Sequence, residues 1–407
     1  MIGNFARSLV FPYSSLYILA LGGNAADIGL VSFLGLLLGL FILPIAGHIT
    51  DHADRIRLLV LSGFLSSLLL LLVIFAPNWQ SVAVAQLLFG SIVFQFPAYA
   101  SLIADSLKPE DRGRGFGAMN LVSSSLAIVA PYLAGMVIDQ YSANLGMRLL
   151  YAAMMILYLC STVIQLRFLR ENSSSPRNPL KLAALTLALE RSYQAIPQLI
   201  RQMSTSLKAL ALVILLSFLA IAVASPFWVV YATDQIGLST IQWGLIMLIE
   251  SVVRLACFLP AGLLVDRWGR KNALLAALVI SLVAQPLFVL WQGFAATLLI
   301  RMALALAFAL AIPASTALMA DLVPRALRGQ LMAAIGQGGL MIAPAGGGAG
   351  GPSMGYLFIP LVMISSLAGG YLYTLNPAYP WFFSMITALF SIPLTIFYIR
   401  EPQKAEI

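Results

Sequence analysis

Apolar runs of about twenty residues dominate the chain, and short polar stretches separate them. A helix of about twenty apolar residues is long enough to cross the hydrocarbon core of a bilayer. There are twelve such runs, six on each side of a polar stretch at 171–207. They lie near 4–22, 27–49, 56–76, 81–104, 114–138, 147–168, 209–231, 241–264, 272–291, 294–320, 353–374 and 380–399. The pattern predicts an all-α, multi-pass membrane protein with twelve transmembrane helices.

The composition supports this class and excludes others. Of the 407 residues, 61% are hydrophobic and only 9% are charged, which is too few for the surface of a soluble enzyme. The net charge of +8 comes from short basic clusters between apolar runs, so we expect no nucleic-acid partner. Both cysteines lie in apolar runs and imply no disulfide framework. We therefore expect no enzymatic activity and no cofactor.

The basic residues orient the chain in the membrane. Of the 23 Lys and Arg residues, 20 lie on the side that holds the 51–57 loop, or at its edge. Arg148 lies near an outer end, and Arg254 and Arg301 lie within apolar runs. Cytoplasmic loops carry an excess of Lys and Arg. The distribution predicts a cell (inner or plasma) membrane protein with both termini in the cytoplasm.

The two halves of the chain repeat one another. AGHITDHADR at 46–55 matches AGLLVDRWGR at 261–270, a shift of 215 residues. Two further pairs, 11–17 with 225–231 and 96–113 with 312–329, match at nearly the same shift. A constant shift over three pairs indicates two copies of one six-helix unit. We expect an N-terminal bundle at 1–170, a linker at 171–207 and a C-terminal bundle at 208–407.

GLLVDRWGRK at 262–271 resembles the signature between helices 2 and 3, and between 8 and 9, of the major facilitator superfamily. The first copy departs from that signature at His52, Asp54 and Ile56. The resemblance covers nearly the whole chain. It implies two six-helix bundles around a central cavity, with substrate moved by alternating access.

Acidic and basic residues recur in register at the inner ends of helices in both halves. Such pairs can hold the halves together in one conformation and release them in another, although a loop cap that also sets topology would leave the same pattern. The expected gate residues are Gly47, Asp51, Arg55, Asp105, Arg112, Gly262, Asp266, Arg267, Gly269, Arg270, Asp321 and Arg328.

Glu250 is the only acidic residue well inside an apolar run, and Arg254 and Arg301 are the basic residues there. A charge at mid-span costs about 2.5–3.5 kcal/mol on insertion scales, so it needs a partner or water. Glu250 and Arg254 are four residues apart and share a helix face. The positions equivalent to Glu250 and Arg254 in the first half are Gly35 and Gly39, so the charges are not part of the repeated scaffold. Three alternatives stay open: proton coupling through Glu250, an anion site at Arg254 and Arg301, and a structural ion pair.

Other expectations follow from the family resemblance and from local composition. Helices 1, 4, 7 and 10 line the path in this family, and ordinary helix packing is the alternative role of their aromatic residues. The candidate cavity residues are Tyr13, Tyr17, Gln95, Tyr99, Phe227, Trp228 and Tyr231. APYLAG at 130–135 partly resembles an element of the family's antiporters and supports export. HITDH at 48–52 has the spacing of a metal site, but it lies within the gate motif, so we predict no metal.

Two segments fall outside the repeat. The linker at 171–207 is expected to contain an amphipathic helix on the inner membrane surface. A Gly-rich insertion at 336–355 is expected to form an inner loop before helix 11, with a break inside the membrane as the alternative.

The sequence thus predicts a secondary transporter, monomeric in the lipid bilayer. We expect it to export small hydrophobic or amphipathic compounds in a proton-coupled cycle. The alternatives are an importer of an organic anion that uses Arg254 and Arg301, and a membrane receptor or sensor on a transporter scaffold.

Overall fold

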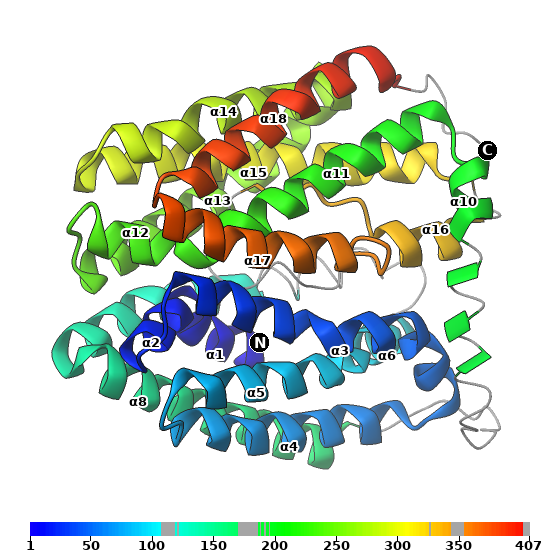
Figure 1. Cartoon of the computed structure of the whole chain (residues 1–407). Coiled ribbons are helices and arrows are strands. Elements are labelled where there is room, and N and C mark those ends of the chain that lie inside the picture. The colour runs from blue at the N-terminus through cyan, green and yellow to red at the C-terminus, as the bar shows by residue number, and fades with distance from the viewer. Residues whose placement is uncertain are drawn as a thin grey trace.

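The chain folds into two helical bundles whose helices run in roughly the same direction (Figure 1). The computed structural model describes residues 1–106, 119, 122–169, 186–187, 189–190, 193–194, 196–324, 327–342 and 354–401. At His48, Asp51, His52 and residues 100 and 104–106 it describes the backbone only. Helices are the sole regular structure of this part of the chain, as predicted.

The N-terminal bundle follows the expected order of spans. Its elements are α1 (Ile2–Val10), η1 (Phe11–Tyr13), α2 (Ser14–Ala20), α3 (Ala25–His52), α4 (Arg55–Ile74), α5 (Trp79–Phe89), η2 (Gly90–Phe94), α6 (Gln95–Ser106) and α8 (Ala130–Phe168). Ser142, at φ 69°, interrupts α8 and divides it into the fifth and sixth expected spans.

The C-terminal bundle repeats that order after α10 (Ile196–Gln202), a helix of the linker. Its elements are α11 (Thr205–Ala224), η3 (Ser225–Phe227), α12 (Trp228–Asp234), α13 (Thr240–Trp268), α14 (Arg270–Leu290), α15 (Phe294–Leu322), α16 (Arg328–Ile335), α17 (Ile359–Leu375) and α18 (Tyr379–Tyr398). Within the described residues, nine helices are long and apolar enough to cross a membrane singly. The total of twelve also needs the divided α8, the shorter α17 and the kinked first span, and it stays a prediction.

Local signals explain why the halves match element by element. Asn24 and Ser239, 215 residues apart, each cap a long helix through a reciprocal capping box, which satisfies backbone N–H groups at the helix start. Pro12 and Pro226 each lie in a 3₁₀ turn within the first span of their half. Proline removes a backbone donor, so the same residue produces the same break twice.

Arg148, the basic residue that lies near an outer end, has a structural role. Its guanidinium donates to the carbonyl oxygens of Ile74 at 2.9 Å and Ala76 at 2.7 Å, and its Nε donates to Asn144 at 2.8 Å. Ile74 is the last residue of α4, where carbonyls lack partners within the helix. Arg148 therefore caps α4 and ties it to α8.

The start of the Gly-rich insertion differs from an inner surface loop. Residues 336–342 are not helical, and Leu340 and Ile342 are buried. The Leu340 N–H donates to the Ser315 hydroxyl at 2.8 Å. Non-helical backbone is tolerated at membrane depth where protein covers it or where it lines a cavity. For 336–342 the structure favours a break inside the bundle, and 343–353 lie outside the described residues.

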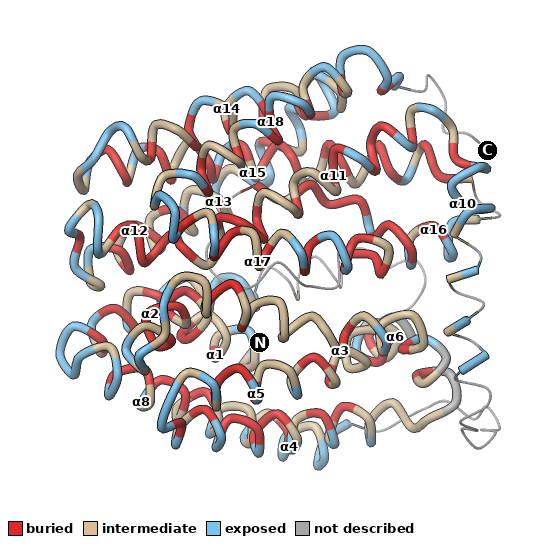
Figure 2. Tube along the Cα trace, viewed as in Figure 1, coloured by how far each residue is buried: buried red, intermediate tan, exposed pale blue. Residues whose placement is uncertain are grey.

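Burial follows the expected division between core and lipid. Buried positions lie between helices, and exposed positions lie on outward faces (Figure 2). Many exposed side chains are large and apolar, including Leu259 and Phe397 on outward-facing spans. Such surface is costly in water and suited to lipid. The fold is therefore that of a membrane-embedded protein.

Candidate functional site

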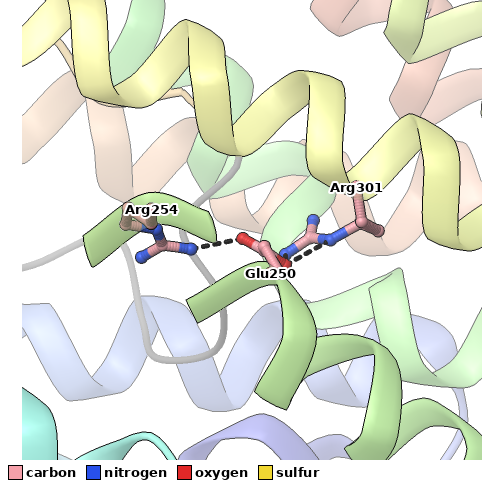
Figure 3. Close-up of polar contacts among 3 residues, drawn as sticks. All are labelled: Glu250, Arg254 and Arg301. Carbon is pink, nitrogen blue, oxygen red and sulfur yellow. Dashed lines mark hydrogen bonds and ion pairs between the residues drawn. The ribbon is translucent and has the colours of Figure 1, made fainter. Parts of the chain in front are cut away.

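Glu250, Arg254 and Arg301 form one cluster inside the C-terminal bundle (Figure 3). Glu250 and Arg254 lie on α13, and Arg301 lies on α15, which packs against it. The Glu250 and Arg301 side chains are 1% exposed, whereas the Arg254 side chain is 23% exposed. The cluster thus extends from the packed interior to an accessible surface through Arg254.

Both carboxylate oxygens of Glu250 accept from a guanidinium group. Oε1 accepts from Nη2 of Arg254. Oε2 accepts from Nη2 of Arg301 at 2.6 Å and from Nε of Arg301 at 2.8 Å. Charge-assisted bonds of this geometry are the strongest hydrogen bonds in proteins. One carboxylate with two guanidinium groups leaves one positive charge uncompensated.

Aromatic rings cover both arginines. The Arg254 guanidinium carbon lies 4.7 Å from the centre of the Phe308 ring. The Arg301 guanidinium carbon lies 4.5 Å from the Trp228 ring centre and 5.7 Å from that of Trp243. Ring faces attract cations and exclude water. The rings therefore stabilise the excess positive charge without neutralising it.

Several donors of this cluster have no acceptor. Among the described residues, Arg254 Nε, Arg301 Nη1 and Trp243 Nε1 are buried without a hydrogen-bond partner. A buried donor without an acceptor costs about 1–3 kcal/mol. All three atoms are donors, so the cluster is complementary to a group rich in acceptor oxygens.

Sequence reasoning missed Trp243 and Phe308, although a signal was available. Trp243 precedes Glu250 by seven residues, and Phe308 follows Arg301 by seven. Seven residues are close to two helical turns, so each ring shares the face of its charged neighbour.

Of the seven candidate cavity residues, five are buried and two are accessible. Tyr17, Phe227 and Tyr231 are buried in packing contacts, with the Phe227 ring stacked 4.5 Å from that of Tyr373 and the Tyr17 hydroxyl bonded to the Val73 carbonyl oxygen. Tyr13 and Trp228 are also buried; the Tyr13 hydroxyl bonds to the Pro131 carbonyl oxygen, and the Trp228 ring covers the Arg301 guanidinium. Gln95 is partly exposed, and Tyr99 is 46% exposed.

A polar hollow lies beside Trp228, between α11, α14 and α18. Gln285, Ser281, Ser384 and Thr387 line it, and residues 340–342 close one side. Gln285 Oε1 is buried and lacks a partner among the described residues. The hollow and the charged cluster thus share Trp228 as a common wall.

Tyr13 joins the two bundles at their outer ends. Its hydroxyl lies 2.8 Å from the Pro131 carbonyl oxygen of α8 and 3.2 Å from the Thr240 carbonyl oxygen of α13. The Thr240 hydroxyl donates to the Gly135 carbonyl oxygen at 3.0 Å. Gly135 belongs to the APYLAG stretch, so this stretch forms part of an outer contact between the bundles.

Glycines bring the backbones of the two bundles together at the same end. A methyl group on Gly29 would lie 2.7 Å from the Ser366 carbonyl oxygen, and one on Gly244 would lie 2.7 Å from that of Pro131. At the opposite ends, a methyl group on Gly47 or Gly262 would meet no atom of the described residues within 4 Å. The two bundles are therefore in backbone contact at this end, which the predicted topology places on the outer side.

The expected gate residues are partly brought together. Arg270 forms an ion pair with Asp321, and its backbone N–H donates to Glu401 at 2.9 Å. Arg328 donates to the Ala320 carbonyl oxygen at 3.1 Å, while Asp266 and Arg267 are exposed. These contacts lie within the C-terminal bundle and do not bridge the halves.

The structure describes only part of the first gate motif. The side chains of Asp51 and Asp105 and the whole of Arg112 lie outside the described residues, as do the side chains of the His48–His52 pair. Arg55, whose side chain is described, begins α4.

The departure of the first motif from its signature has a physical reason. Gly269 is the N-cap of α14 and has φ 89°, a conformation that favours glycine. Its equivalent, Asp54, is the N-cap of α4 with φ −67°, and its side chain accepts the Arg57 N–H at 2.9 Å. The first copy thus replaces a glycine turn with an ordinary N-cap.

The structure thus has two related helical bundles that are joined by a linker and touch at one end, with a buried charge cluster in the C-terminal bundle. This is a transporter-type membrane fold. The sequence profile of the Major Facilitator Superfamily matches residues 1–207 and 210–407. The chain belongs to this superfamily, a class of transporters rather than enzymes.

Curated relatives and solved structures agree with this assignment. Multidrug resistance protein MdtG of Enterobacter lignolyticus is 28% identical over 291 residues, which are 68% of this chain and 65% of that protein. MdtG of Salmonella typhimurium is 27% identical over 287 residues, 68% of this chain and 67% of that protein. The match therefore spans about two thirds of the length of these relatives.

A point mutant of the nucleoside transporter NupG superposes with a TM-score of 0.70 at 16% identity, covering 98% of this chain and 97% of that chain. A bacterial homologue of the lysosomal transporter Spinster gives 0.68 at 14% identity, covering 98% of this chain and 93% of that chain. At these identities the likeness concerns the fold alone.

Proposed function

We propose that this chain exports small hydrophobic or amphipathic compounds across the cell membrane by alternating access, with proton coupling through Glu250. The observation that carries the proposal is the position of Glu250. Its carboxylate is buried, yet one of its two partners, Arg254, has 23% of its side chain exposed. A conformational change that hydrates Arg254 would therefore alter the stability of the Glu250 carboxylate directly.

The outer-closed arrangement gives this coupling a physical basis. With both carboxylate oxygens bonded to arginines, the charged form of Glu250 is held in place. When the bundles rock and open the outer side, water competes for Arg254, and the Glu250 carboxylate loses part of its stabilisation. Proton binding then becomes more favourable in one conformation than in the other, as a coupled cycle requires.

The direction of transport is supported by two features. The relatives in the curated comparison carry the name multidrug resistance protein. In this chain the APYLAG stretch and Tyr13 close the outer side through hydrogen bonds and backbone contact. The APYLAG stretch partly resembles an element of the family's antiporters, which supports export.

A second candidate function is the import of an organic anion. It is favoured by the uncompensated positive charge and by the unpartnered donors of Arg254, Arg301 and Trp243. An anion that engages the arginines competes with the Glu250 carboxylate, and a proton on Glu250 would relieve that competition. Proton and anion would then bind cooperatively and move in the same direction.

The sign of coupling separates the two candidates. Proteoliposomes are preloaded with radiolabelled 1-naphthalenesulfonate or with its permanently cationic counterpart, (1-naphthylmethyl)trimethylammonium. The medium is then made acidic, and protein-free liposomes provide the control. If the protein exports its substrate in exchange for protons, acid outside should accelerate the loss of one preloaded probe from the proteoliposomes. Anion import predicts that acid outside slows the loss of sulfonate, because each exit step would carry a proton out against its gradient. Failure of the acid gradient to change either flux would contradict both candidates.

A further inference from the structure

The linker reaches between the two bundles through Tyr193. Its hydroxyl donates to the Leu40 carbonyl oxygen of α3 at 2.9 Å, a contact between the linker and the N-terminal bundle. Its ring lies 5.7 Å from the ring of Tyr356, edge to face, just before α17 of the C-terminal bundle. One side chain of the linker therefore touches both halves.

The Leu40 carbonyl is available because of Pro44. In an α-helix the carbonyl of residue 40 accepts the N–H of residue 44. Proline has no N–H, so Pro44 leaves this acceptor without its helical partner. The Tyr193 hydroxyl replaces the missing donor and makes a contact that the helix itself cannot make.

The contact between Tyr193 and Leu40 lies within the apolar part of α3, away from its inner end. The apolar part of α3 ends at Gly47, seven residues beyond Leu40. At 1.5 Å per residue, the Tyr193 hydroxyl meets α3 about 10 Å from that end. Burial raises the pKa of Tyr193, and the neighbouring Tyr356 raises it further, so the hydroxyl keeps its proton at physiological pH.

The geometry of the outer ends shows when this bridge can form. Gly29 of α3 and Gly370 of α17 are in backbone contact there. At the inner side Tyr193 contacts the same helix α3 and the residue Tyr356 just before α17. Rocking the bundles to open the outer side changes the distance between α3 and α17 at the inner side, where the phenol ring lies.

We infer that Tyr193 is a bridge that selectively stabilises the outer-closed conformation by supplying the hydrogen bond that Pro44 denies to Leu40. The linker thereby sets the balance between the two access states of the carrier. The inference needs only the two-bundle fold and its rocking motion. It is independent of substrate and of proton coupling.

Spin-label distances test the bridge on the full-length protein in nanodiscs, with Cys160 and Cys257 replaced by serine. One label pair, at Phe75→Cys and Leu290→Cys, reports the outer ends of the two bundles. A second pair, at Phe168→Cys and Phe397→Cys, reports the inner ends. All four positions are exposed, so labelling leaves the packing unchanged.

Tyr193→Phe removes only the hydroxyl. A neutral hydrogen bond of this kind shifts an equilibrium about two- to tenfold. The outer-open population should increase by this factor, and Tyr193→Ala, which also removes the contact with Tyr356, should increase it further. Tyr158→Phe is the matched control, because the Tyr158 hydroxyl bonds to Arg7 within the N-terminal bundle.

A double-mutant cycle tests the role of Pro44. Pro44→Ala restores the helical donor for the Leu40 carbonyl, so Tyr193→Phe should have a smaller effect in that background. Equal effects with Pro44 and with Pro44→Ala would overturn the proposed bond. The bridge itself would be overturned if Tyr193→Phe changed the outer-open population no more than Tyr158→Phe does. It would also be overturned if the parent protein and Tyr193→Ala showed the same single population.

Discussion

Gly29→Ala should open the outer side of the carrier. A methyl group at this position would lie 2.7 Å from the Ser366 carbonyl oxygen and 3.1 Å from the Gly370 backbone, both on α17 of the other bundle. These atoms are backbone, so no side chain can move aside. Restoring ordinary contact at about 3.4 Å requires α3 and α17 to separate by about 0.7 Å.

The free-energy cost of this clash determines how far the ratio of the outer-open to the outer-closed population shifts. Overpacking a close contact costs about 1–3 kcal/mol. Because the clash exists only while the outer ends touch, that cost is paid by the outer-closed state alone. The ratio of outer-open to outer-closed populations should therefore rise about 5- to 150-fold.

Gly35→Ala is the matched control on the same helix. A methyl group there would meet Gln86 of its own bundle at 3.9 Å, an ordinary contact distance. Both substitutions raise helix propensity equally, so this effect cancels. The outer pair of spin labels provides the assay. Equal outer distances in the two variants would refute the view that this glycine contact seals the outer side.

Three further variants probe other parts of the structure. Tyr13→Phe removes the hydroxyl that bridges α8 and α13, and the outer-open population measured by the same labels should increase about two- to tenfold; an unchanged population would contradict the bridge. Arg148→Gln leaves two carbonyl oxygens at the end of α4 without a charged donor. Thermal unfolding in detergent should then show that the free energy of unfolding falls by about 1–3 kcal/mol. The control Arg57→Gln changes an exposed side chain and should lower it by only about 0–1 kcal/mol. Arg301→Gln breaks a buried pair and should cost about 3–5 kcal/mol; full stability in this variant would show that Glu250 does not need Arg301.

The sequence predicted those features of the fold that local signals determine. The capping residues Asn24 and Ser239 and the prolines Pro12 and Pro226 act within one helix, so their effects repeat at a fixed spacing. A charge inside an apolar run also requires a partner, so the sequence alone indicates that Glu250 pairs with Arg254 or Arg301.

Other features depend on contacts between distant segments. The path of 336–342 beside α15 follows from how the C-terminal bundle closes, which composition does not specify. The Tyr193 contact requires that the linker lie against α3, and no periodicity in the linker indicates that. Aromatic residues such as Phe227 are equally suited to a cavity wall and to a packed interior, so type and position alone could not separate these roles.

The most direct test of the central claim is transport by Glu250→Gln in proteoliposomes. Two fluxes of the probe that the wild-type protein carries are compared: accumulation or loss driven by an acid gradient, and exchange at equal pH on both sides. The proposed role of Glu250 predicts that the variant keeps exchange, which needs only alternating access, and loses the response to the gradient. Gradient-driven flux equal to that of the wild-type protein would contradict proton coupling through Glu250.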